Sequence, residues 1–166
     1  SPGASDLEIY RQAYRKQQQA LQSAWEARDP VLPYRSAYEA LVLASIVEKE
    51  TGQAHERPQI AGVFVRRLQA NMRLQTDPTV IYGMADAYQG NIRKQDLRRD
   101  TPYNPYIRAG LPPTPIAMPG RAALTASAHP AGGDALYFVA KGNGEHLFSA
   151  TYDPHRKAVQ TYQKTQ

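Results

Sequence analysis

The longest apolar segment of the chain lies between residues 36 and 52 and predicts a buried helix. Its sequence, SAYEALVLASIVEKETG, begins with the Ser-x-x-Glu pattern of a capping box and ends at a glycine, as many helices do. Apolar residues occur on almost every side of this helix, whereas a surface helix carries them on one face. We therefore place this helix in the core.

Two acidic residues, Glu48 and Glu50, lie near the end of the predicted helix and point to nearly opposite sides of it. Glu50 continues the apolar stripe formed by Leu43, Ile46 and Val47. Apolar surroundings make a carboxyl group costly to ionise and raise its pKa, as a general acid requires. Glu50 is therefore a candidate catalytic acid, and the alternative is a residue at the helix rim paired with an arginine.

Apolar periodicity elsewhere predicts a mostly helical α+β fold. It predicts helices over residues 5–28, 57–71, 77–82 and 120–129, and a last one that begins at Asp153-Pro154. Trp25 is expected to be a packing residue, and Gly83 is expected to end its helix. The β-prone runs LYFVA and HLFSA flank KGNGE and predict a small antiparallel β-hairpin.

A long proline-rich loop is expected between residues 84 and 120, where little periodicity occurs. Within it, Tyr103, Asn104 and Tyr106 combine flat aromatic faces with an amide, which is the combination that sugar sites use. Long loops inside compact domains are usually functional. We interpret this loop as the wall of a cleft; the alternatives are a rigid packed loop and a ligand for proline-recognition modules.

The segment RLQTDPTVIYG contains a further group of polar candidates. Asp77 precedes Pro78, which is typical of an N-cap followed by proline in the first helical turn, and we favour this interpretation over a catalytic role. Gln75, Thr76 and Tyr82 could line a polar cleft.

The composition is that of a soluble globular protein. The chain has 166 residues, of which 42% are hydrophobic and 21% charged. This length suits a single domain, which we assign to residues 5–166, while residues 1–4 could be a remnant of cloning. No apolar run approaches the roughly 20 residues that span a bilayer, and no signal peptide is recognisable.

The net charge of +5 favours an anionic partner. Because the basic residues are scattered, nucleic acid is not expected as that partner. The chain has no cysteine, which excludes disulfides, thiolate metal sites and a cysteine nucleophile. The four histidines lack metal-ligand spacing, and no phosphate loop or nucleophile elbow occurs. Neither a metal nor a cofactor is therefore predicted.

Four blocks of the sequence resemble the YceG-like endolytic murein transglycosylases in order and spacing. They are LASIVEKETG, RLQTDPTVIYG, YNPYIRAGLPPTPIAMPG and LYFVAKGNGEHLF, and the resemblance covers residues 36–162. It implies a lysozyme-like catalytic domain acting on peptidoglycan glycan strands, with cell-wall synthesis proteins as partners. It also implies an N-terminal anchor in the bacterial inner membrane, a periplasmic location, and an upstream LysM-like domain; neither the anchor nor that domain is found in this sequence.

The resemblance also implies how the chemistry works. Glu50, followed by Thr51, is the expected catalytic acid for cleavage of the MurNAc-β-1,4-GlcNAc bond, with closure of a 1,6-anhydro ring on MurNAc. Asp77 is the reserve carboxylate. The residues expected to orient the sugar are Gln75, Thr76, Tyr82, Tyr103 and Asn104.

The sequence departs from the family pattern at two places and leaves two other functions open. Met118 stands where the family has Asn, and Pro154-His155-Arg156 stands where it has Glu-His-Asn. One alternative is a hydrolytic muramidase, in which Glu50 is the acid while Asp77 or Glu48 activates water. The other is a peptidoglycan-binding module without catalysis.

Overall fold

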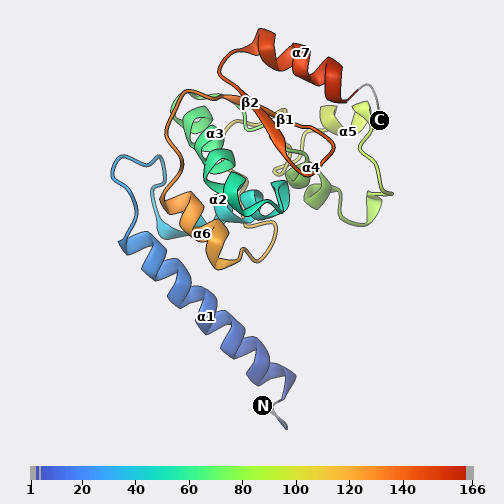
Figure 1. Cartoon of the computed structure of the whole chain (residues 1–166). Coiled ribbons are helices and arrows are strands. Elements are labelled where there is room, and N and C mark those ends of the chain that lie inside the picture. The colour runs from blue at the N-terminus through green and yellow to red at the C-terminus, as the bar shows by residue number, and fades with distance from the viewer. Residues whose placement is uncertain (1–2, 4, 164–166) are drawn as a thin grey trace.

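The computed structural model describes residue 3 and residues 5–163. The expectation that residues 1–4 are a remnant of cloning therefore lies outside the described residues, except for Gly3. The helices are α1 (Asp6–Glu26), α2 (Ala37–Glu50), η1 (Ala54–Glu56), α3 (Arg57–Gln69), α4 (Asp77–Met84), η2 (Ala85–Ala87), α5 (Lys94–Arg98), α6 (Arg121–Ala128) and α7 (Tyr152–Tyr162). The strands are β1 (Tyr137–Ala140) and β2 (His146–Ser149), which pair with each other. This mostly helical structure with a small sheet confirms the predicted α+β class (Figure 1).

Helix α2 lies at the centre of the core, as its apolar sequence predicts (Figure 1). Leu43, Ile46 and Val47 have no exposed surface, and the helix packs against α3 and α6. The Ser36 side chain accepts a hydrogen bond from the N–H of Glu39, which caps the helix at its first turn. The last helical residue is Glu50. The next residue, Thr51, is the C-cap and has an extended backbone, and Gly52 follows it.

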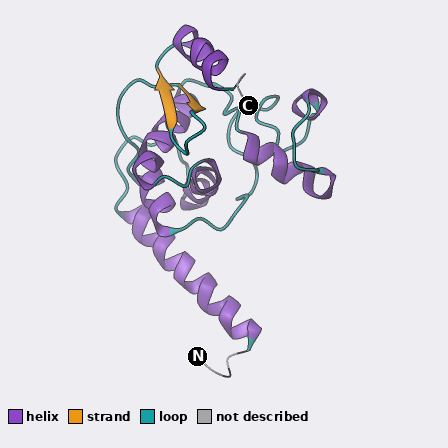
Figure 2. Ribbon diagram, turned by 45° about the vertical axis from the view of Figure 1, so that its right-hand side comes forward, coloured by secondary structure: helices purple, strands orange, loops and turns teal. Residues whose placement is uncertain are grey.

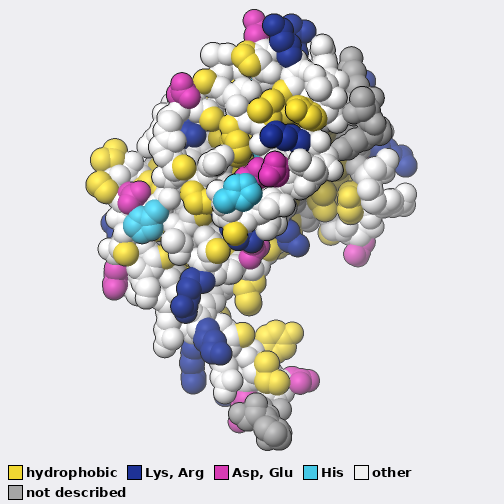
Figure 3. All heavy atoms as spheres, in the orientation of Figure 1, with side chains coloured by type: hydrophobic (Ala, Val, Ile, Leu, Met, Phe, Trp, Pro, Cys, Tyr) yellow, Lys and Arg dark blue, Asp and Glu magenta, His cyan; other side chains and the backbone are white. Residues whose placement is uncertain are grey.

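Helix α1 reaches out from the body of the domain (Figures 1 and 3). Its first turn has the predicted capping box, in which the side chains of Ser5 and Glu8 each accept the other's backbone N–H. Only its C-terminal part joins the core, where Leu21 is buried and Trp25 packs against the cluster as predicted. No helix of the described residues is both long enough and apolar enough to cross a bilayer.

The predicted hairpin forms beside α3 and is covered by α7 (Figure 2). Its register pairs Phe138 with Phe148, and the Phe138 ring meets Phe64 of α3 edge-on, with 5.7 Å between centroids. Aromatic pairs in this geometry add to the burial of each ring. The hairpin is therefore held in one position against the helical core.

Two expectations for α4 are wrong. Thr76 occupies the N-cap position but its side chain makes no capping hydrogen bond, and Asp77 is the first residue of the helix, so the Asp77 carboxylate is not the N-cap. Gly83 lies inside the helix, which continues to Met84. A Cβ at Gly83 would come within 2.8 Å of the Tyr103 Cβ, so the glycine permits close packing of the loop instead of ending the helix.

Residues 99–120 contain no helix or strand, and Asn104 organises their beginning. Its buried amide nitrogen donates to the carbonyls of Leu97 and Arg99, at 3.0 and 2.7 Å, and thereby satisfies the end of α5. Its amide oxygen accepts the N–H of Tyr106 at 2.9 Å. The sequence analysis did not predict α5, whose five residues lie in the stretch expected to be loop.

Candidate active site

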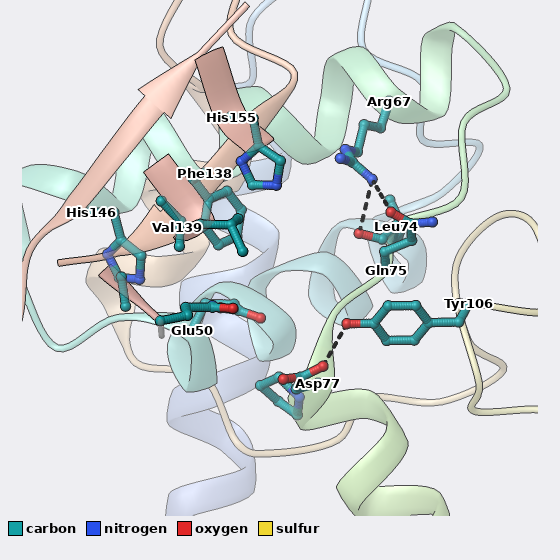
Figure 4. Close-up of a pocket in the computed structure, with 14 residues that line it drawn as sticks. Glu50, Arg67, Leu74, Gln75, Asp77, Tyr106, Phe138, Val139, His146 and His155 are labelled. Atoms are coloured by element: carbon teal, nitrogen blue, oxygen red, sulfur yellow. Dashed lines mark hydrogen bonds between the residues drawn. The ribbon is translucent and has the colours of Figure 1, made fainter. Parts of the chain in front are cut away.

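A polar cavity of about 360 Å³ opens between the end of α2, the start of α4 and the hairpin (Figure 4). On the space-filled surface, acidic, basic and histidine side chains lie beside one another near the hairpin (Figure 3). The chemistry-bearing residues that line the cavity are Glu50, Arg67, Gln75, Asp77, Tyr106, His146 and His155. Segments far apart in the sequence thus meet at one site.

Glu50 occupies the last position of α2 and points into the cavity (Figure 4). Burial raises its pKa from the ordinary value of 4.5 to about 7, and the neighbouring charge of Asp77 acts in the same direction. The Thr76 hydroxyl, which donates to Glu50 Oε1 at 2.5 Å, and the charge of His146 oppose this rise. Glu50 is therefore protonated in a large fraction of molecules at neutral pH.

The interpretation of Glu50 as a rim residue paired with an arginine is wrong. Among the residues that the structure describes, no basic side chain lies within 4.0 Å of its carboxylate. Thr51, the next residue, is buried, and its hydroxyl accepts the N–H of Gln53. A carboxyl group that is partly removed from water and has no cation beside it is the arrangement that keeps an acid protonated.

Asp77 faces the same cavity as Glu50 and binds a residue of the proline-rich loop. Its carboxylate accepts the hydroxyl of Tyr106 at 2.5 Å. Burial and Asp77 raise the pKa of Tyr106 well above its usual range, so the phenol remains a donor. Gln75 has φ of 53°, a left-handed conformation that non-glycine residues seldom adopt, and it also lines the cavity.

A buried Glu56–His146 pair forms the cavity wall on the hairpin side. The Glu56 carboxylate accepts both the backbone N–H and the ring Nδ1 of His146, each at 2.7 Å. Burial favours the neutral form of Glu56, but the two hydrogen bonds and the charge of His146 together lower the pKa of Glu56. The pair fixes the ring with its other nitrogen available to the cavity. Sequence analysis missed it because the two residues lie 90 positions apart.

Arg67 and His155 form the cavity wall opposite Glu50 (Figure 4). Arg67 is buried and donates to the carbonyls of Leu136 and Arg73, at 2.7 and 2.8 Å. His155 stacks on Tyr137, with 4.9 Å between centroids. Burial and the charge of Arg67 lower the pKa of His155, which favours the neutral ring. Neither residue was a predicted site residue, although His155 lies where the sequence departs from the family pattern.

The structure brings four predicted site residues together and places three elsewhere. Glu50, Gln75, Thr76 and Asp77 meet at the cavity through side chains or the Thr76 hydrogen bond. The other three are Tyr82, Tyr103 and Asn104. Tyr103 and Asn104 line a second cavity of about 260 Å³, and the exposed Tyr82 ring packs against Tyr103 at 4.9 Å between centroids.

Glu48, which was considered as an assistant to Glu50, contacts the start of another helix instead. Glu48 Oε1 accepts the backbone N–H of Gly120, the N-cap residue of α6, at 2.7 Å. A carboxylate at this position complements the positive end of the α6 dipole. Among the described residues, no three histidine or acidic side chains form a group that could hold a metal ion.

The fold and the cavity define a mostly helical domain in which Glu50 faces a polar cavity. Comparison with known proteins identifies the family: the chain belongs to the YceG-like family, whose model matches residues 1–161. It is 43% identical over 127 residues to the endolytic murein transglycosylase of Bacillus subtilis. It is 39% identical over 126 residues to the protein of the same name from Streptococcus pneumoniae.

A solved structure supports the same assignment. A crystal structure of a YceG-like protein from Listeria monocytogenes has a TM-score of 0.70 and 35% identity, over 90% of this chain and 45% of that one. The alignments with the Bacillus and Streptococcus relatives cover 76% and 73% of this chain. The chain spans only 35% and 23% of the length of those relatives.

Proposed function

We propose that this chain is the catalytic domain of an endolytic murein transglycosylase, which cleaves the MurNAc-β-1,4-GlcNAc bond inside glycan strands. The observation that carries the proposal is Glu50, an acid without a cationic partner at the edge of a polar cavity, with its pKa raised to about 7. A carboxyl group that is protonated near neutral pH can supply the proton that a glycosidic oxygen needs to leave.

One carboxyl group can perform both proton transfers of the proposed reaction. Protonated Glu50 gives its proton to the glycosidic oxygen while the bond from MurNAc C1 to that oxygen breaks. The Glu50 carboxylate then takes the proton of the MurNAc C6 hydroxyl as that oxygen attacks C1 and closes the 1,6-anhydro ring. Atoms and charges balance without water, and Glu50 returns to its starting state.

The neighbours of Glu50 have positioning roles in this proposal. Thr76 holds the carboxyl oxygen by its 2.5 Å hydrogen bond, and Gln75 and Asp77 present polar groups to the sugar. Tyr82, Tyr103 and Asn104 lie outside this cavity, so a role for them requires a glycan strand that extends along the loop. That role stays a prediction.

The proposal extends to where the whole protein acts. The names of the relatives support action on the cell wall. We extend the proposal to the periplasmic face of the bacterial inner membrane as the place of that action. Anchoring in that membrane and partnership with cell-wall synthesis proteins belong to the same proposal, through parts of a longer protein. The net charge of +5 suits a polymer with carboxylate groups.

Asp77 supports a second candidate function, a hydrolytic muramidase. Its carboxylate shares the cavity with Glu50 and could activate a water molecule on the far side of the sugar. In that reaction water rather than the C6 hydroxyl attacks C1, and the new end is a reducing sugar.

Mass spectrometry of products from purified peptidoglycan tests both candidates. A transglycosylase leaves 1,6-anhydro ends, which are lighter by one water than the reducing ends of a hydrolase. We expect anhydro ends from the wild-type chain and neither product from Glu50→Gln. Reducing ends alone would establish the muramidase, and binding without any cleavage would reduce the chain to a binding module.

A further inference from the structure

Arg67 is a buried cation that lines the cavity. It is 7% exposed, and within the described chain no carboxylate lies within 4.0 Å of its guanidinium. We infer that Arg67 forms a subsite for a carboxylate of the muramic acid residue, on the opposite side of the cavity from Glu50. This inference rests on the proposed function and names the substituent that the site selects.

The protein holds the guanidinium in one orientation. Nε donates to the Leu136 carbonyl at 2.7 Å, and Nη1 donates to the Arg73 carbonyl at 2.8 Å. The plane also lies over the Tyr137 ring, with 5.0 Å between the guanidinium carbon and the ring centroid. These contacts use two of the three nitrogens and fix the direction of the third.

The third nitrogen, Nη2, has no acceptor among the described residues and borders the cavity, into which the guanidinium points (Figure 4). The charge of Arg67 also acts on its neighbour: burial, and then this charge, lower the pKa of His155. The more distant oxygen acceptors of Nη1 are also neutral: the Leu74 carbonyl and the Gln75 amide, both at 3.5 Å. An incoming anion would therefore meet an uncompensated positive charge and a free donor.

A murein strand offers a carboxylate in two chemical forms close to the bond that Glu50 would cleave. The lactyl ether on MurNAc carries a free carboxylate wherever the stem peptide has been removed. Where the peptide is present, that carboxyl is an amide and the peptide supplies its own carboxylates further out. GlcNAc carries neither, so a carboxylate subsite would also set which sugar lies on which side of Glu50.

The test compares four preparations of the same glycan strands. Two lack stem peptides and have the lactyl carboxylate free or capped as a neutral methylamide. Two retain the peptides, with their carboxylates free or capped in the same way. Dissociation constants are measured with Glu50→Gln, so that the strands stay intact, and turnover is measured with the wild-type chain.

We expect the free form of one pair to bind at least tenfold more tightly than its capped form, as for a charge-assisted hydrogen bond. A tenfold ratio in the strands without stem peptides identifies the lactyl carboxylate as the ligand, and a tenfold ratio in the strands with stem peptides identifies a peptide carboxylate. Ratios near one in both pairs would overturn the inference. A tenfold ratio without any wild-type turnover would instead overturn the proposed function and leave the subsite standing.

Arg66 supplies the matched control. Its guanidinium is also fixed by carbonyls, those of Ala135 and Ala131, but it does not line the cavity. In the Glu50→Gln background, Arg67→Gln should bring the free-to-capped ratio to about one, whereas Arg66→Gln should leave it unchanged. A ratio that survives Arg67→Gln would overturn the assignment. If Arg67→Gln does not fold, the free-to-capped binding ratios measured with Arg67 present still decide whether the site selects a carboxylate.

Discussion

The last turn of α2 places two glutamates, two positions apart, in two contrasting regions of the molecule. On one side, Glu48 meets a backbone N–H at the start of α6, in partly exposed surroundings. On the other side, Glu50 faces the cavity, where a hydroxyl is its hydrogen-bond donor and Asp77 lies nearby. The same side chain on the same helix thus meets the backbone N–H of a helix terminus in one region and a hydroxyl beside a second carboxylate in the other.

This difference indicates what makes an acid useful to a reaction. A carboxylate that complements a helix terminus stabilises the fold. A carboxyl group that burial and a like charge keep protonated costs stability when it ionises, and it can deliver the proton to a substrate. The cavity side of α2 is therefore where we expect chemistry, and the α6 side is where we expect structure.

The largest expected effect separates the two regions by activity. Glu50→Gln keeps the shape and the Thr76 hydrogen bond but has no proton to give, so cleavage of peptidoglycan should fall at least about 10³-fold. Glu48→Gln is the matched control and should retain activity within about threefold. Release of soluble fragments, measured for both variants at equal concentration, checks this. Equal losses of activity in the two variants would refute the division of α2 into a catalytic side and a structural side.

The second prediction concerns stability and pH. Because the pKa of Glu50 is raised from 4.5 to about 7, the folded state binds its proton more tightly than the unfolded state does. The resulting stabilisation is complete below pH 4.5 and is lost as pH rises to 7. Glu50→Gln lacks this loss, so above pH 7 it should be more stable than wild type by up to about 3 kcal/mol.

Urea denaturation of both proteins between pH 4 and 8 measures the difference in the free energy of unfolding. The two curves should run together at pH 4 and separate as pH rises. A variant that is less stable than wild type at pH 8 would mean that the Glu50 carboxylate is paired in the folded protein, contrary to its surroundings in the structure.

The third prediction contrasts the cavity with the loop. Asn104→Ala leaves the partly buried carbonyls at the end of α5 without this donor, so it should cost about 2 kcal/mol of unfolding free energy. Its effect on KM should be small if the glycan binds only at the Glu50 cavity. Gln75→Ala should raise KM with little change in stability, because the side chain of Gln75 is exposed at the cavity. Reversed effects would place the sugar on the loop.

Sequence analysis predicted those features that one segment determines by itself. The burial of α2 and the position of Glu50 follow from residues within a single helix, and the hairpin follows from two adjacent runs. It could not predict Asp77 correctly, since the N-cap pattern is local whereas its actual partner, Tyr106, comes from a loop 29 residues away. Local propensity gave the right helix and the wrong role for its first residue.

The remaining site residues could not be predicted from the sequence, for a related reason. Arg67 lies in a helix whose apolar face was evident, but its donors reach the carbonyls of Leu136, just before β1, and of residues 73–74, which no periodicity connects. The aromatic loop is a different case, because its role toward the sugar stays a prediction. Tyr103 and Asn104 have the residue types of a sugar site, yet the amide of Asn104 satisfies backbone groups of its own neighbourhood. Residue type determines which hydrogen bonds a side chain can make, and only the packing of the fold determines which partners it meets.

The smallest effect tests the structural side of the comparison. Glu48→Gln can still accept the Gly120 N–H, but it loses the charge that complements the α6 terminus, so the free energy of unfolding should fall by about 0.5–1 kcal/mol at low salt. Salt screens a partly exposed charge, so the difference should shrink at 1 M NaCl, whereas a lost hydrogen bond would not respond in this way. Urea midpoints at the two salt concentrations measure it. A loss that is independent of salt would assign Glu48 a packing or hydrogen-bonding role, and no loss at all would mean that α6 does not need the carboxylate.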